Sequence, residues 1–271
     1  MPALASWTPQ VRVAAPNLWQ LPVPAAALQR ARGIFEEALM PLFLDGLVAE
    51  LDAQFVPCKE LRTGHGHSFF AMRGGSSTNQ ALRDSSDLAW VSVNDESTFD
   101  VFAEIFAATG VGEALSPLID LADKVALYSC FFVVRSRCSD LNLHTDWPDS
   151  VGNNAFTLLT PIDDYSSADG FHLLYEDRAG ALQQYRYQLG EAICFSSRFV
   201  HGTEPGKATP DARGRARPHA FLCFTFGSDK AAHWPEIQPT IGGYQSRFLR
   251  RFDGASELTD IGRYLQRAGA V

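Results

Sequence analysis

The sequence predicts a mainly β protein with helices on its flanks. Between residues 124 and 227 the apolar runs are short, contain many β-branched and aromatic residues, and are separated by turn residues. On both sides of this region the apolar residues recur at helical spacing instead. About eight short strands so close together are typical of a sandwich or a barrel, of which the jelly roll is a common form.

Length and composition exclude several classes of protein. The chain has 271 residues, of which 46% are hydrophobic and 20% charged, so it is neither disordered nor a small disulfide scaffold. We expect one domain over residues 1–271. A net charge of −8 disfavours nucleic acid as a partner. No apolar run is long enough to span a membrane. Five cysteines without CxxC spacing, and no secretion signal, indicate buried, reduced thiols and a cytoplasmic location.

The N-terminal third, residues 1–123, is expected to hold an extended arm and helices. Four prolines in the first 22 residues predict the arm. Helical spacing of apolar residues then predicts two helices broken at Pro41, and a further helical pair over residues 98–123. Residues 62–78 are rich in Gly, Ser and His, which predicts a mobile surface loop suited to covering a site. His65 and His67 have no acidic residue or cysteine close by, so we interpret them as exposed loop residues.

The central region is interpreted as a series of strands, with helices after it. The expected strands cover residues 125–134, 140–147, 153–162, 170–177, 183–189, 191–197, 198–203 and 219–227. Residues 242–252 and 257–270 are expected to form C-terminal helices that pack outside the strands.

His144 and Asp146 are the first candidate metal ligands. Side chains alternate along a strand, so these two residues project from the same face. His201 is a candidate third ligand, because it stands at the end of an apolar strand and directly before a Gly and Pro turn. Two histidines and one carboxylate form a facial triad, which suits iron(II) and leaves positions open for an oxidant and a bidentate cosubstrate.

Arginines precede the last predicted strand. Arg213, Arg215 and Arg217 all lie just before it or at its first residues. An arginine in this position would hold a carboxylate through two parallel charge-assisted hydrogen bonds.

Together these residues resemble the Fe(II)/2-oxoglutarate-dependent dioxygenases. The resemblance rests on His144-Thr145-Asp146, on the later His201 and on an arginine that opens the last strand. It implies a double-stranded β-helix core, the cupin-like jelly roll, over residues 124–227, with C-terminal helices over residues 228–271.

The same resemblance implies the cofactors and their ligands. His144, Asp146 and His201 would bind Fe(II) and form the catalytic centre, with 2-oxoglutarate as cosubstrate and O2 as oxidant. Arg217 would bind the far carboxylate of 2-oxoglutarate because it borders the strand, and Arg215, of the same strand parity, is the alternative. One departure is the turn at residues 207–216, which sets these arginines further from His201 than is usual in the family.

The expected reaction is hydroxylation of an unactivated C–H bond, with release of succinate and CO2. We expect the substrate to be a small metabolite, an amino acid or a natural-product intermediate, because no macromolecule-binding module is evident. Candidate contacts with the substrate are Trp147, Arg135, Tyr128 and Phe195. Three alternatives stay open: a peptide or protein hydroxylase with a long open groove, a non-catalytic cupin-like metal-binding protein, and a zinc-dependent hydrolase using the same triad.

Overall fold

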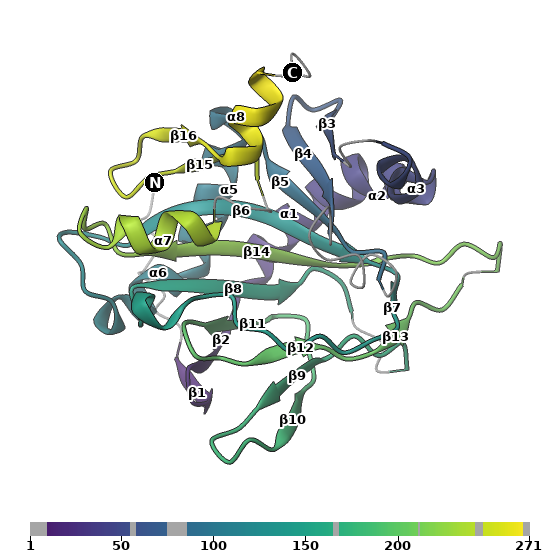
Figure 1. The fold of residues 1–271 in the computed structure, drawn as a ribbon. Helices are drawn as coiled ribbons and strands as arrows, with labels where there is room; N and C mark the ends of the chain where they lie inside the picture. Colours follow the sequence, from purple (N-terminus) through teal and green to yellow (C-terminus); the bar gives the residue numbers. More distant parts are fainter. Residues whose placement is uncertain are drawn as a thin grey trace.

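The structure is a computed structural model that describes residues 10–54, 58–74, 86–164, 168–210, 212–241 and 246–267. Nine strands form its main antiparallel sheet, in the order β1-β2-β11-β8-β14-β6-β5-β4-β3 (Figure 1). Their bounds are β1 Arg12–Ala15, β2 Leu18–Pro22, β3 Cys58–Arg62, β4 Ser68–Arg73, β5 Ala89–Val93, β6 Ala126–Arg135, β8 Ala155–Pro161, β11 Glu191–Phe195 and β14 His219–Gly227.

A smaller sheet has the order β10-β9-β12 and is grouped at the bottom of Figure 1. Its strands are β9 Leu173–Glu176, β10 Leu182–Tyr185 and β12 His201–Thr203. Two-residue strands β7 (Arg137–Cys138) and β13 (Gly206–Lys207) form a further pair. The chain passes repeatedly from one sheet to the other, from β8 to β9 and β10, back to β11, then to β12 and back to β14. This topology is a jelly roll, so the predicted fold class is confirmed.

Helices cover one side of the main sheet. They are α1 Ala25–Ile34, a π-helical turn Phe35–Leu39, α2 Met40–Leu44, α3 Leu47–Asp52, α5 Glu96–Thr109, α6 Val111–Leu115 and a 3-10 turn Ser116–Leu118. The side chain of Asp95 caps α5 by accepting from the backbone N–H of Thr98, at 2.7 Å. Phe102 on α5 packs edge-on against Phe69 and Phe132 of the sheet. The largest apolar core therefore lies between the helices and the sheet.

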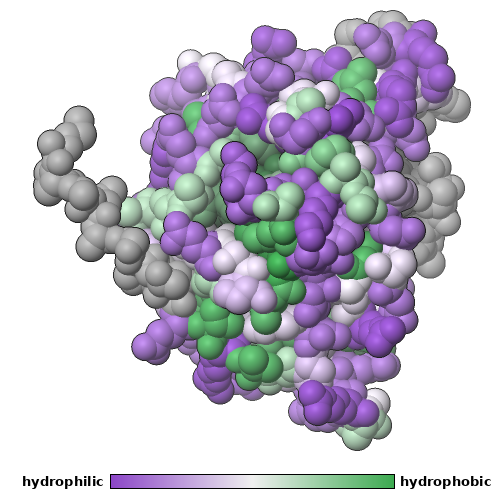
Figure 2. Space-filling view, turned by 90° about the vertical axis from the view of Figure 1, so that its left-hand side faces the viewer, coloured by the Kyte–Doolittle hydropathy of each residue, from purple (hydrophilic) through white to green (hydrophobic). Residues whose placement is uncertain are grey.

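Strand β6 shows how the sheet separates this core from the opposite side. Its residues alternate: Phe132 and Val134 face the helical core, whereas Phe131, Val133 and Arg135 line a cavity on the other side. The end of α7 (Trp234–Ile241) also reaches this cavity, through Pro239, Thr240 and Ile241. The face at the left of Figure 1 carries hydrophobic side chains at its centre, surrounded by hydrophilic ones (Figure 2).

Two predictions for the N-terminal third are wrong. Residues 12–22 are not an extended arm, because β1 and β2 add two strands to the main sheet beside β11. Residues 62–78 are not a surface loop as far as the structure describes them: Arg62 ends β3, Ser68–Arg73 form a fully buried strand, and turns are confined to residues 63–67 and Gly74. The apolar run Phe69–Met72 is buried between neighbours β3 and β5, which outweighs the surrounding Gly and Ser. Residues 75–78 of that prediction lie outside the described residues.

Two more elements differ from the prediction. Residues 140–147 form no strand, because their backbone pairs with a neighbouring segment at one position alone, His144 with His201. Within residues 242–252, the described part contains β15 (Phe248–Arg250) instead of a helix, paired with β16 (Ser256–Leu258). The final predicted helix is confirmed as α8 (Asp260–Arg267), and the helical stretches near residues 24–55 and 98–123 are confirmed where described. The break predicted at Pro41 is wrong, because the helical chain continues through Pro41 to Leu44 and breaks at Gly46, which has a φ of 99°. All five cysteines are free and buried, as expected.

Candidate active site

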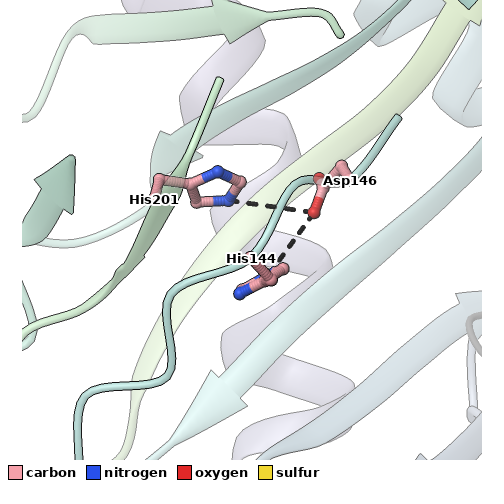
Figure 3. A group of neighbouring side chains, drawn as sticks. All are labelled: His144, Asp146 and His201. Atoms are coloured by element: carbon pink, nitrogen blue, oxygen red, sulfur yellow. Dashed lines mark ion pairs between the residues drawn. The ribbon is translucent and has the colours of Figure 1, made fainter. Parts of the chain in front are cut away.

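Three predicted ligands converge on one point in the structure (Figure 3). One ligand atom from each of His144, Asp146 and His201 lies within 4.8 Å of the other two. Asp146 Oδ1 is 3.5 Å from His144 Nε2 and 3.8 Å from His201 Nε2. It is the one group of this kind among the described residues, and His65 and His67 have no part in it. The predicted triad is therefore brought together by the fold.

A backbone bridge between two distant segments places the two histidines side by side. The N–H of His144 donates to the carbonyl of His201 at 2.8 Å, and the N–H of His201 donates to the carbonyl of His144 at 2.9 Å. The two imidazole rings then lie with their centroids 4.7 Å apart. Phe199 stacks on His201, with centroids 5.1 Å apart and an interplanar angle of 19°. This exchanged pair of hydrogen bonds holds His144 beside His201, which is the role expected of a strand over residues 140–147.

Backbone carbonyls set the tautomer of both histidines. His144 Nδ1 lies 3.0 Å from the carbonyl oxygen of Asn142, and His201 Nδ1 lies 3.0 Å from that of Phe199. A carbonyl oxygen only accepts hydrogen bonds, so each Nδ1 carries the proton. Each Nε2 then presents a lone pair toward Asp146, which is the arrangement of a metal-binding imidazole.

Asp146 is oriented by a short hydrogen-bond chain. Thr157 Oγ1 donates to Asp146 Oδ2 at 3.1 Å, and Trp147 Nε1 donates to Thr157 Oγ1 at 3.0 Å. Oδ2 is thereby occupied, and Oδ1 faces the two imidazoles. Both Thr157 and Trp147 are buried, so solvent does not compete for these bonds.

The electrostatic environment favours metal-binding protonation states at two of the three ligands. Burial acts to raise the pKa of Asp146, but the hydrogen bonds and charges of the two histidines outweigh it and the pKa is lowered. Burial lowers the pKa of His201, so this imidazole is neutral at neutral pH. Burial would also lower the pKa of His144, yet its contacts with Asp146 and Asn142 raise it. Without a metal, Asp146 and His144 thus form an ion pair as the pH falls.

The triad opens into a cavity of about 520 Å³ between the main and the smaller sheet. Its walls are mainly aromatic and aliphatic, including Trp90, Phe131, Phe171, Tyr187, Phe195 and Phe221. The side chain of His201 is 8% exposed, whereas that of His144 is 48% exposed. His201 is therefore shielded from solvent, whereas the site is open to solvent beside His144.

Neither predicted cosubstrate arginine lines this cavity. Arg217 pairs with Asp163 at 2.8 Å and with Glu36, and its side chain is 48% exposed. Arg215 belongs to the exposed turn that precedes β14. The first residue of β14 is His219, whose Nε2 lies 2.9 Å from Asp169 Oδ2. The structure therefore brings the three metal ligands together but not these two arginines.

Three of the four candidate substrate contacts, Trp147, Arg135 and Phe195, line the cavity. Tyr128 is not among its lining residues, and its hydroxyl donates to the carbonyl of Ser228 at 2.7 Å. Sequence analysis did not identify Thr157 and Thr203, because a threonine in a predicted strand gives no indication of which side chain its hydroxyl bonds to. Arg135 could be placed from the sequence, because it alternates with Phe131 and Val133 along one strand and therefore projects from the same face as they do.

No single helix among the described residues is long and apolar enough to cross a membrane. The helices at 96–109 and 111–118 meet the length and composition requirement only as a pair bent by 59°.

No protein-family model matches the sequence, and no curated protein matches it. The chain is similar in structure to AviO1 from Streptomyces viridochromogenes Tue57, with a TM-score of 0.45, 12% identity, and 78% of this chain and 89% of that chain covered. It is also similar to HygX from Streptomyces hygroscopicus, solved with nickel, 2-oxoglutarate and hygromycin B bound (TM-score 0.44, 12% identity, 78% and 83% covered). A Pseudomonas putida prolyl-4-hydroxylase gives a TM-score of 0.38, 14% identity, and 78% and 92% covered. Identities of 12–14% leave the substrate to be inferred from the pocket itself.

Proposed function

We propose that the protein is an Fe(II)- and 2-oxoglutarate-dependent oxygenase that hydroxylates a C–H bond of a small molecule. The observation that carries this proposal is the His144, Asp146 and His201 group at the wall of a largely apolar cavity in a jelly roll. Two neutral imidazoles and one carboxylate on one side of a metal leave the remaining positions open.

The residues present fit iron(II). Both Nε2 atoms and Asp146 Oδ1 point to a common centre, and their opposite atoms, Nδ1 and Oδ2, are already hydrogen-bonded. Iron(II) bound with 2-oxoglutarate and O2 supplies an oxidant strong enough for an unactivated C–H bond, with succinate and CO2 as coproducts. The protein would hold the metal through the triad and orient the substrate against the walls of the cavity.

The shape and lining of the cavity support a small, largely uncharged substrate. A volume of about 520 Å³ falls within the range typical of small-molecule sites. Aromatic walls would bind an apolar face of the substrate, while Asp140, Asn142 and Thr145 offer polar contacts. A peptide hydroxylase would be expected to have a long open groove. None of residues 62–74, the described part of the segment expected to cover the site, lines the cavity, whereas the end of α7 contributes Pro239, Thr240 and Ile241.

The test is an anaerobic titration of the protein with Fe(II) and 2-oxoglutarate, followed through the weak visible charge-transfer band of the iron chelate. We expect the band in the wild-type protein and its loss in His144→Ala and in His201→Ala, because each variant removes one ligand. His65→Ala is the matched control, since this histidine is exposed and lies outside the triad, and it should leave the band unchanged.

Absence of the band in the wild-type protein would contradict the proposal. If zinc or iron then still bound to the triad, a hydrolase or a non-catalytic metal-binding protein would replace the oxygenase as the best account.

A further inference from the structure

Arg135 is a charged residue at an inward position of the main sheet. It ends β6 and follows Phe131 and Val133 along the wall of the cavity. Its Nη1 donates to Thr203 Oγ1 at 2.6 Å. Thr203 stands two residues after His201 on β12, so both side chains project from the same side of that strand and both line the cavity. The guanidinium thus bridges the main sheet and the strand that carries a metal ligand.

The charge of Arg135 has no counterion in the described part of the chain. No carboxylate of that part pairs with it, and its Nε is buried without a hydrogen-bond partner. Arg247 and Arg250 also have an unpartnered Nε, but they pair with Glu60 and Asp100 and do not line the cavity. A partly buried cation that lacks an anion is costly, and the geometry of a guanidinium matches that of a carboxylate.

Arg135 and the three residues of the triad line the same cavity. A dicarboxylate that chelates a metal through one end at the triad has its second carboxylate within the same cavity. Among the described lining residues, Arg135 is the one arginine or lysine available to it.

We infer that Arg135, supported by Thr203, binds the far carboxylate of 2-oxoglutarate. This inference rests on the proposed function and assigns the cosubstrate subsite to the end of β6 and not to the residues that open β14. Arg217 is already neutralised by Glu36 and Asp163 on the outer side. Once Arg135 is bound to the cosubstrate, no arginine or lysine of the described lining remains for an anionic group of the substrate, which favours an uncharged substrate.

The experiment compares two 2-oxo acids in the anaerobic Fe(II) protein, with the charge-transfer band as the measure of binding. 2-Oxoglutarate carries the far carboxylate, and 2-oxopentanoate has a methyl group in its place. In Arg135→Gln we expect the affinity for 2-oxoglutarate to fall by about 10-fold or more, since a hydrogen bond to a charged group is lost. The affinity for 2-oxopentanoate should stay unchanged.

Two further variants sharpen the comparison. Arg217→Gln is the matched control and should leave the affinity for both acids unchanged. Thr203→Val, which removes one support of the guanidinium, should weaken 2-oxoglutarate binding by a smaller factor than Arg135→Gln does. Arg135→Lys keeps the charge and should give an intermediate affinity, which separates a binding role from misfolding.

Three results would overturn the inference: an unchanged 2-oxoglutarate affinity in Arg135→Gln, an equal loss for both acids, or a loss in Arg217→Gln. The failure of the proposed function looks different. In that case the wild-type protein gives no band with either acid, and the subsite assignment falls with it.

Discussion

At the scale of single residues, the site depends on groups that orient the metal ligands as much as on the ligands. Thr157 is the clearest case, because its hydroxyl donates to Asp146 and accepts from the indole N–H of Trp147. One oxygen atom therefore determines which carboxylate oxygen faces the metal position and also satisfies a buried donor.

Thr157→Val keeps the shape of the side chain and removes this hydroxyl. We expect metal affinity to fall by about 10- to 100-fold, the range found when an outer partner of a ligand is lost. Leaving the buried indole N–H of Trp147 without an acceptor should also cost about 1–3 kcal/mol of stability. Metal titration and urea unfolding measure the two effects.

Thr160→Val is the control for this prediction. Thr160 lies on the same strand and is buried, but it donates to the carbonyl of Glu191 and does not line the cavity. Its loss should lower stability while metal affinity stays unchanged. Equal metal affinity in Thr157→Val and Thr160→Val would show that the Thr157 hydroxyl does not orient Asp146.

At the scale of elements, the close crossing of two loops shapes one wall of the cavity. A Cβ atom on Gly206 would lie 2.4 Å from the carbonyl oxygen of Asp169, and one on Gly170 would lie 2.4 Å from that of Pro205. Between these contacts Phe171 adopts a φ of 65°, an unusual conformation for a bulky residue, and its ring lines the cavity. The two glycines let the backbones approach closely enough to hold Phe171 in place.

Gly206→Ala should destabilise the protein by about 1–3 kcal/mol, because the added methyl group meets backbone that has no rotamer to change. Gly64→Ala is the control, since a Cβ atom there has no neighbour within 4 Å and the effect should stay within about 0.5 kcal/mol. Urea unfolding of both variants measures the difference. Equal stability of the two variants would refute the role assigned to the crossing.

At the scale of the whole molecule, the two faces of the main sheet have different roles. Residues on one face form the core that stabilises the fold, and residues on the other face form the candidate active site. Its helical side holds the largest apolar core, with Phe102 of α5 fully buried against the sheet. Its other side carries the cavity and the triad. Changes on the helical side should therefore act on folding without acting on the site of the folded protein.

Phe102→Ala tests this separation. Removing a fully buried aromatic ring should cost about 3–5 kcal/mol of stability. Below its unfolding transition, the variant should bind Fe(II) and 2-oxoglutarate as the wild-type protein does. Tyr264→Ala is the control, because Tyr264 on α8 is 44% exposed, and it should change the free energy of unfolding little. A loss of binding in folded Phe102→Ala would contradict the separation.

Much of the fold and the metal centre was predictable from local chemistry. Strand patterns from Ala126 to Gly227 follow from apolar and β-branched runs between turn residues, and they are confirmed in order except for residues 140–147, which form no strand. The triad was identified because only a few side-chain types bind iron and because His144 and Asp146 stand close in sequence. Single-domain organisation and a cytoplasmic location stay predictions.

Tertiary structure decided the features that depend on distant partners. Residues 68–73 form a strand because β3 and β5 flank them, and the segment around His144 forms none because it meets only His201. Which arginine faces the cavity was decided in the same way. Glu36, 181 residues away in the sequence, pairs with Arg217, while Arg135 lines the cavity without a counterion among the described residues. By itself the sequence determined which side chains can bind a metal, because metal binding is a property of each residue type. Only the folded structure determined which arginine is paired with a carboxylate, because an ion pair requires the two side chains to be in contact.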